Sequence, residues 1–254
     1  MIYIFDGTYQ GFLCCVFTYF EYKDTAVRLQ LSGDDACQTD MFSASRSIVT
    51  DVPKAQRVQH GLQKHVGSTV AMDFFSVLLS EDRKAWAAAF YIVCRIFSGQ
   101  ADILENFGDD QVLYFTQTVK KVSRERHRMK AFVRFQKSND GLFFAVIEPD
   151  FNVLPLIADF FKKRYADQKW LIYDVKRKYG LLYDKRTVSE VNISPEDKQA
   201  LSADEVITLD EKDEHFQQLW KRYFQSTNIE ARRNMKLHLQ HVPRRYWKYL
   251  VEKQ

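Results

Sequence analysis

The sequence lacks the features of several large classes of protein. It contains no run of roughly eighteen apolar residues, the length that a membrane-spanning helix needs, so we expect no segment to cross a membrane. The first ten residues, MIYIFDGTYQ, contain neither a basic stretch nor a small-residue cleavage site. We therefore expect no secretory signal peptide and a cytoplasmic location.

Cysteine is scarce and poorly spaced for metal or redox chemistry. The four cysteines are Cys14, Cys15, Cys37 and Cys94, and no two of them have C-x-x-C spacing. This pattern favours buried, reduced thiols over a disulfide framework or a zinc site. The sequence also has no P-loop and no G-x-G-x-x-G motif, and no local pattern supports Ser-His-Asp or Cys-His chemistry. We expect no bound cofactor.

The 254 residues are 46% hydrophobic and 15% aromatic, enough for one large domain or two small ones. Charge is distributed unevenly along them. Residues 1–115 hold 9 Lys and Arg against 14 Asp and Glu, whereas residues 116–254 hold 28 against 19. Within the second part, residues 192–215 are acidic, with eight carboxylates and two lysines. We predict a single unit over 1–254, with a possible sub-division into an acidic part, 1–115, and a basic part, 116–254.

Periodicity predicts a mostly helical first part. Short strands are expected at 2–5, 27–31 and 45–50, and a helix follows the first strand. Three helices are expected between Pro53 and Ser98, broken near Gly67 and near residues 80–82, and a further helix at 109–128.

The second part alternates strand and helix patterns. Strands are expected at 131–135 and 142–148, joined by a hairpin turn at Ser138–Gly141, and a helix at 153–161. A second hairpin joins 170–174 to 180–184, and a strand is expected at 188–193. Helices are expected within the acidic stretch and at 216–224. Pro243 is expected to end one helix near Val242 and to open another as its first residue. The fold class is α+β: a helical N-terminal half and a mainly antiparallel sheet covered by helices.

The end of the chain combines cations with aromatic rings. Residues 232–250, RRNMKLHLQHVPRRYWKYL, contain no carboxylate, and Tyr246, Trp247 and Tyr249 lie among the last cations. Such a segment can neutralise phosphates and stack on bases, or it can be a solvated helix whose aromatic side closes the core. The nucleic-acid-binding candidates here are Arg232, Arg233, Lys236, Arg244, Arg245, Trp247 and Lys248.

Two further basic clusters occur in the second part. One follows the helix at 109–128 and reaches a predicted strand; the other lies at the tip of the second hairpin. Cations at a helix end also suit the helix dipole, and hairpin tips are often charged for solubility, so each cluster alone is weak evidence. The candidates are Arg124, Arg126, Arg128, Lys130, Arg134, Lys176, Arg177 and Lys178.

Three carboxylates at predicted strand ends, Asp6, Glu148 and Asp150, are the candidates for catalysis. Hydrolysis of a phosphodiester or glycosidic bond can use such groups through a metal or a positioned water. Asp6 suits a turn equally well, and Asp150 suits a helix cap. His238 and His241 are spaced to share a metal on a helix, but no third ligand is evident, so no metal site is predicted.

Five separated blocks of sequence resemble a known family. They are FDGTYQGFL (5–13), RMKAFVRF (128–135), IEPDFNVLPL (147–156), DQKWLIYD (167–174) and HVPRRYWKYL (241–250). The chain resembles an uncharacterised bacterial family labelled for DNA metabolism and DNA repair. The resemblance implies association with a radical SAM protein of DNA modification or repair and, in some members, fusion to a uracil-DNA glycosylase-like domain. We expect no such fused domain here, and the sequence lacks the C-x-x-x-C-x-x-C motif of a radical SAM enzyme.

Together these observations predict a DNA-binding accessory protein of a repair or modification pathway. The resemblance implies that it acts with a radical SAM partner and with a uracil-DNA glycosylase-like protein. Two alternatives stay open. One is a DNA repair hydrolase that uses Asp6, Glu148 or Asp150, and the other is a protein-interaction module without DNA affinity.

Overall fold

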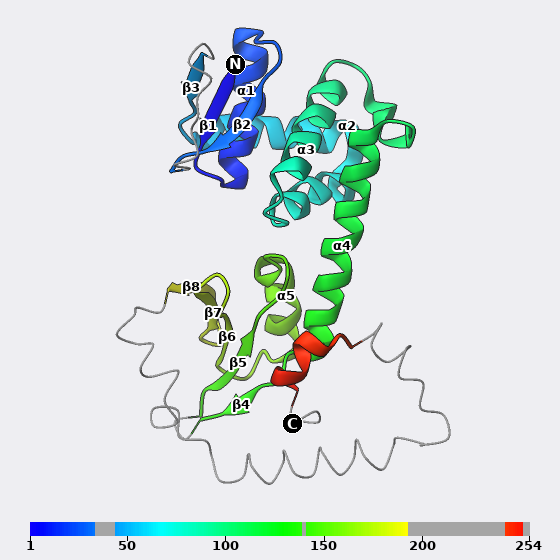
Figure 1. Cartoon of the computed structure of the whole chain (residues 1–254). Coiled ribbons are helices and arrows are strands. Elements are labelled where there is room, and N and C mark those ends of the chain that lie inside the picture. The colour runs from blue at the N-terminus through cyan, green and yellow to red at the C-terminus, as the bar shows by residue number, and fades with distance from the viewer. Residues whose placement is uncertain (34–43, 139–140, 193–241, 251–254) are drawn as a thin grey trace, which may run out of the picture. The chain divides into compact units, whose positions relative to one another are not determined.

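A computed structural model describes residues 1–33, 44–138, 141–192 and 242–250. The helix expected at 216–224, the acidic stretch beyond Asn192 and the histidines of 232–241 lie outside these ranges. The chain forms two compact units, Met1–Ser123 and Arg124–Gln254, and helix α4 (Asp110–Phe132) contains the boundary between them. Figure 1 shows the elements of both units.

The first unit contains a parallel three-stranded sheet. Strands β1 (Ile2–Phe5), β2 (Arg28–Leu31) and β3 (Ser45–Ser47) lie in the order β2-β1-β3, and both neighbours pair in parallel with β1. Helix α1 (Tyr9–Tyr22) connects β1 to β2, as a parallel crossover requires. Thr8 caps α1, because its side chain accepts a hydrogen bond from the Gly11 N–H.

The remaining helices of this unit are α2 (Val52–Leu78), α3 (Arg83–Phe97), the 3-10 turn η1 (Ala101–Glu105) and the first part of α4. The predicted breaks are confirmed. Helix α2 is kinked at Gly67, where φ is +80°, and α3 begins after the cap residue Asp82. Helix α3 is buried over much of its circumference, and its Trp86 meets Phe5 edge to face with ring centroids 5.9 Å apart.

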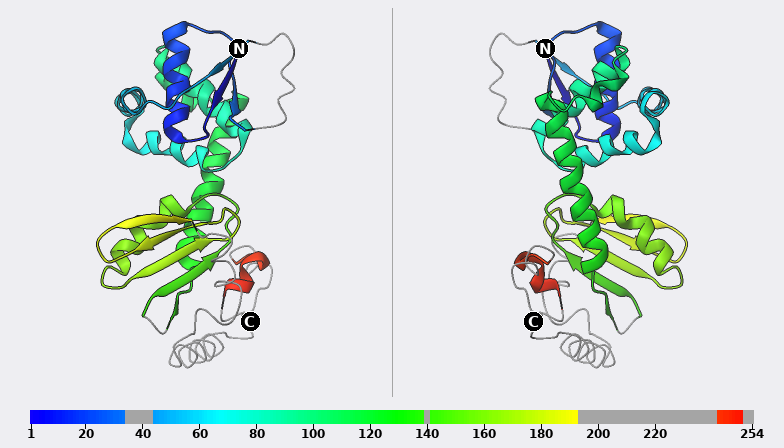
Figure 2. Two further views of the ribbon diagram at one scale, coloured as in Figure 1. Left: turned by 90° about the vertical axis from the view of Figure 1, so that its left-hand side faces the viewer. Right: turned by 90° about the vertical axis from the view of Figure 1, so that its right-hand side faces the viewer.

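The second unit is built on a five-stranded sheet in the order β4-β5-β6-β7-β8. The strands are β4 (Gln136–Lys137), β5 (Phe143–Ile147), β6 (Trp170–Asp174), β7 (Tyr179–Tyr183) and β8 (Val188–Asn192). Among these five described strands, β5 and β6 pair in parallel and the other neighbours are antiparallel. Helix α5 (Leu154–Arg164) connects β5 to β6 across one face of the sheet (Figure 2). The predicted α+β class with a mainly antiparallel sheet is confirmed.

Aromatic side chains form much of the core beneath α5. Trp170 of β6 is fully buried, and its ring lies 6.3 Å from Phe161 and 5.4 Å from Tyr183. Phe135 packs edge to face on Phe161 at 5.7 Å. These contacts fix β5, β6 and α5 relative to one another, and with them the loops at the ends of the strands.

The strand predicted at 131–135 is wrong. Helix α4 continues to Phe132, and the strand that follows is only Gln136–Lys137. The reason is helical periodicity, because buried Val122 and Met129 lie seven residues apart on one stripe of α4, and the Val133 N–H still donates to the Met129 carbonyl at 3.1 Å. Arg134 therefore does not project from a strand; its Nη1 donates to the carbonyls of Ala131 and Val133 at 2.6 and 3.3 Å.

The predicted burial of the thiols is confirmed for Cys14, Cys15 and Cys94, which are buried and not in disulfides. Cys37 lies outside the described ranges. None of the helices in those ranges combines the length and the apolar character that crossing a bilayer requires.

Candidate nucleic-acid interface

Two loops of the second unit lie side by side because β5 and β6 are parallel. Ile147 and Asp174, their last residues, are register partners, and the Val175 N–H donates to the Ile147 carbonyl at 3.1 Å. The loop after β5 begins at Glu148, and the turn after β6 contains Lys176. In α/β sheets, ligand sites commonly lie just beyond the carboxyl ends of parallel strands.

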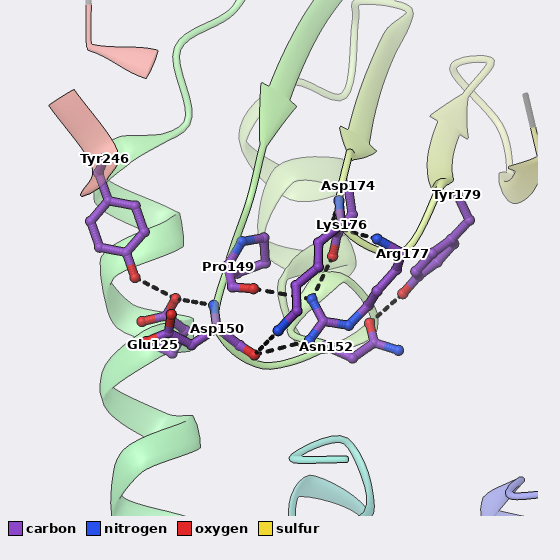
Figure 3. Close-up of polar contacts among 9 residues, drawn as sticks. All are labelled: Glu125, Pro149, Asp150, Asn152, Asp174, Lys176, Arg177, Tyr179 and Tyr246. Carbon is purple, nitrogen blue, oxygen red and sulfur yellow. Dashed lines mark hydrogen bonds and ion pairs between the residues drawn. The ribbon is translucent and has the colours of Figure 1, made fainter. Parts of the chain in front are cut away.

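Arg177 joins these two loops (Figure 3). Its guanidinium donates to the carbonyls of Pro149 and Asp150 at 3.1 and 3.0 Å and forms an ion pair with buried Asp174 at 2.8 Å. The Asp174 carboxylate also accepts the backbone N–H groups of Lys176 and Arg177, which shapes the turn. The Arg177 side chain is only 8% exposed, so its charge is used in these contacts between the two loops and is not available to a ligand.

Glu125 of α4 is a buried carboxylate that connects three segments of the unit (Figure 3). Its side chain is 2% exposed. Oε1 accepts the Asp150 N–H at 2.9 Å and the hydroxyl of Tyr246, while Oε2 lies 3.3 Å from Arg245 and 3.7 Å from Arg128. A buried charge needs such partners, since an unpaired one carries a large desolvation penalty.

The segment that supplies Tyr246 is the 3-10 helix η3 (Arg244–Tyr249), which follows Pro243. This agrees in part with the sequence, which predicted a helix opened by Pro243 itself. Tyr246 is buried and its ring lies 5.4 Å from that of Phe132 in α4. Burial, and then the hydrogen bond to Glu125, raise the pKa of the Tyr246 hydroxyl, which therefore stays protonated as a donor.

Glu148 forms a second connection to η3 near the surface. Its Oε2 pairs with the Lys248 ammonium and accepts the Tyr249 hydroxyl at 2.8 Å. These hydrogen bonds, from Lys248 first and then from Tyr249, lower the pKa of Glu148, and the same ion pair raises the pKa of Lys248. Both groups are therefore charged at neutral pH.

An open pocket with a volume of about 480 Å³ lies among these residues. Its volume falls within the range usual for small-ligand sites. Four cationic and two anionic side chains line it, so the lining has a formal charge of +2. The lining residues are Glu148, Pro149, Asp150, Lys176, Arg244, Arg245 and Lys248.

The structure thus brings together four predicted cations from two distant parts of the chain: Lys176 of the β6–β7 turn, and Arg244, Arg245 and Lys248 of η3. Two of the four are paired with acids, because Arg245 contacts Asp150 at 2.5 Å and Lys248 contacts Glu148. Lys176 and Arg244 form no ion pair with a carboxylate in the described ranges. The Lys176 ammonium donates instead to the Asp150 carbonyl at 3.1 Å.

Other predicted cations do not line this pocket. Lys130 lies 5.1 Å from the ring of Phe160, and Lys178 is exposed in the β6–β7 turn with φ of +61°. The other described cations that were predicted to bind DNA but do not line the pocket are Arg124, Arg126, Arg128, Arg134 and Arg177. Arg232, Arg233 and Lys236 lie outside the described residues.

The aromatic candidates of η3 differ in accessibility. Tyr246 is buried and cannot stack on a base. Trp247 is half-buried, its indole N–H donates to the Val242 carbonyl at 3.1 Å, and Arg244 lies 6.0 Å from its ring.

The three candidate carboxylates belong to different units. Glu148 and Asp150 line the pocket of the second unit, whereas Asp6 directly follows β1 in the first. Asp6 shapes the turn before α1: its Oδ1 accepts the N–H and hydroxyl of Thr8, and its Oδ2 accepts the Thr50 hydroxyl at 2.7 Å. Burial opposes ionisation of Asp6, but these hydrogen bonds, from Thr50 first, bring its pKa below the ordinary value. The predicted cap at Asp150 is wrong, since Val153 precedes α5.

Sequence reasoning missed Glu125 and Asp174. Glu125 was visible only as the one acid within the basic run at 124–130, a position that also suits a solvated helix end. Among the described residues, no three His, Cys, Asp or Glu side chains form a cluster that could hold a metal ion.

Residues 83–252 match the family described as a domain of unknown function, DUF4130. No curated protein and no solved structure matches the chain. The match covers all of α3 and α4 and nearly the whole second unit, so the pocket lies within the shared domain. The DNA metabolism label and the radical SAM and glycosylase associations stay predictions.

Proposed function

The chain belongs to the DUF4130 family, and we propose that it binds DNA through the cationic pocket of its second unit, as an accessory protein of a repair or modification pathway. One observation supports this most directly. Exposed cations of the β6–β7 turn and of η3, separated by more than sixty residues in the sequence, line one pocket. Cations in such a group neutralise neighbouring phosphates and release their counterions.

The two ion pairs of the pocket compete with phosphate binding to different extents. Lys248 is 60% exposed in its pair with Glu148, and exposed pairs contribute only about 0–1 kcal/mol, so a phosphate can replace the carboxylate. Arg245 also faces buried Glu125 and is expected to stay there. Lys176, Arg244 and Lys248 are therefore the proposed phosphate contacts, with Arg245 as the residue that holds η3 in place.

Trp247 is the proposed stacking residue for an unpaired base. Trp247 and Tyr249 are both half-buried in η3, but the Tyr249 hydroxyl is bonded to Glu148. Trp247 precedes Lys248 in the sequence, and its ring lies 6.0 Å from the Arg244 guanidinium. A stacked base contributes about 1–3 kcal/mol. Single-stranded DNA is therefore expected to bind more tightly than duplex, and Trp247→Ala is expected to reduce this difference.

Charge reversal tests the proposal. Fluorescence anisotropy with labelled single- and double-stranded DNA should give a much higher Kd for the double variant Lys176→Glu/Arg244→Glu than for the wild type. Lys64→Glu, which reverses an exposed cation of α2 in the first unit, is the matched control and should leave the Kd within about twofold. Equal affinity of the wild type and the double variant contradicts the proposal.

The proposed partners rest on the family resemblance. A radical SAM protein of DNA modification or repair and a uracil-DNA glycosylase-like protein are expected to co-purify with the chain. If the radical SAM protein co-purifies and no DNA affinity is measured, the chain is instead a protein-interaction module.

A hydrolase is the second candidate, because Glu148 and Asp150 line the same pocket. Glu148 is ionised at neutral pH through its bonds to Lys248 and Tyr249, so it can act as a base or stabilise a cation but cannot donate a proton. Release of product from a damaged or uracil-containing oligonucleotide, lost in Glu148→Gln, would favour this candidate.

A further inference from the structure

We propose that the same pocket receives the terminal phosphate monoester of a DNA strand. This inference rests on the proposed function and specifies its ligand. The lining has four cations and two carboxylates, a formal charge of +2. A phosphate monoester carries about −1.5 to −2 at pH 7, whereas each internal phosphodiester carries a single negative charge. A terminal phosphate therefore matches the charge of the lining better than an internal one does.

The size and position of the pocket suit the end of a strand. About 480 Å³ exceeds the volume of one phosphate group and leaves room for part of the attached nucleotide. Asp150 projects from the loop after β5, and the Lys176 ammonium is held against the Asp150 carbonyl at 3.1 Å. This contact positions one cation at the wall of the pocket before a ligand arrives, which lowers the entropy lost on binding.

The two carboxylates have a defined role in this arrangement. Glu148 and Asp150 hold Lys248 and Arg245 at the pocket and at the same time repel anions. The repulsion weakens the binding of every phosphate, so a ligand with one negative charge gains little from the remaining positive charge. A doubly charged group gains most from Lys176 and Arg244, which form no ion pair in the described ranges. We therefore expect selection of strand ends that carry a phosphate.

The experiment compares oligonucleotides of one sequence that carry a 5′-phosphate, a 3′-phosphate or hydroxyls at both ends. Binding to the full chain is measured by competition against a labelled oligonucleotide at pH 7.5. At least one phosphorylated form should bind about tenfold more tightly than the hydroxyl form, the effect of a single charge-assisted contact. The two phosphorylated forms distinguish the 5′ from the 3′ end.

Variants and pH assign the preference to the pocket. Lys176→Ala and Arg244→Ala should each reduce the ratio of affinities toward one, whereas Lys64→Ala should leave it unchanged. The ratio should also fall between pH 7.5 and pH 5, because the second pKa of a phosphate monoester is about 6.

The outcomes separate the two proposals. Equal, salt-dependent binding of all three oligonucleotides overturns the terminal-phosphate site and leaves DNA binding in place. A preference that persists in both pocket variants also overturns it. Absence of binding to every oligonucleotide contradicts the proposed function and this inference together.

Discussion

The hydroxyl of Tyr246 donates a hydrogen bond to Oε1 of Glu125, 121 positions earlier in the chain. Both side chains are buried, and the same Oε1 accepts the Asp150 N–H. This carboxylate therefore holds the last described segment, η3, against α4 and against the loop after β5. The position of Arg244 and Lys248 at the pocket depends on this connection.

Replacement of Tyr246 by Phe should destabilise the protein while it preserves the ring packing on Phe132. A hydrogen bond to a charged group contributes about 1.5–3 kcal/mol, so a loss of this size in the free energy of unfolding is expected from chemical denaturation. Tyr249→Phe is the matched control, since its hydroxyl bonds to the more exposed Glu148 and should contribute less than about 1 kcal/mol. Equal losses in the two variants would show that Glu125 does not fix η3.

The ion pair between Glu148 and Lys248 should give stability a defined pH dependence. The pKa of Glu148 is lowered from its ordinary value of 4.5, chiefly by Lys248 and then by Tyr249. Because the pKa is lowered in the folded state, the stabilisation by ionised Glu148 is present above pH 4.5 and is lost as the pH falls through the lowered pKa. The wild type should have a higher free energy of unfolding than Glu148→Gln at pH 7, and the two values should converge in acid. A difference that is constant from pH 7 to pH 3 contradicts this assignment.

Glu148→Gln should also strengthen DNA binding. The substitution raises the formal charge of the pocket from +2 to +3 and releases Lys248 from its carboxylate. Affinity at low salt should rise by up to about fivefold, the equivalent of one exposed ion pair. Glu190→Gln, which removes an exposed carboxylate from β8 of the same unit, should have a smaller effect. Weaker binding by Glu148→Gln would mean that DNA contacts the carboxylate itself.

The buried thiols should be unreactive in the native protein. Burial raises the pKa of Cys94 to about 12 and raises those of Cys14 and Cys15, so little thiolate is present at neutral pH. In a Cys37→Ser variant, a thiol-specific reagent should modify the remaining three cysteines only after denaturation. Rapid modification of the folded variant at pH 7 would contradict their burial.

Local features of the sequence predicted most elements of the fold. Helix α2 bends at Gly67 and α3 begins after Asp82, because a glycine with positive φ and a capping carboxylate act within one turn of helix. The strand predicted at 131–135 failed for a physical reason. A short apolar run such as Ala131–Val133 fits a helix as well as a strand, and the burial of Val122 and Met129 on one stripe favoured continuation of α4 to Phe132.

The candidate site was predictable only in part. The basic clusters that contain Lys176 and Arg244 were visible as charge, but charge alone does not show which cations share a surface. Arg177 reads as an exposed hairpin tip, yet buried Asp174 and two carbonyls of another loop hold it in the interior. Glu125 could not be found, because its partners Asp150 and Tyr246 are remote in the sequence.

The salt dependence of DNA affinity tests the central claim most directly. The logarithm of the association constant of the wild type should fall linearly with the logarithm of the salt concentration between 50 and 200 mM, by about 0.9 for each duplex phosphate neutralised. Lys176→Ala and Arg244→Ala should each reduce this slope by about one contact, and Lys64→Ala should not change it. A wild-type slope near zero, or the same slope in all four proteins, would contradict DNA binding by this pocket.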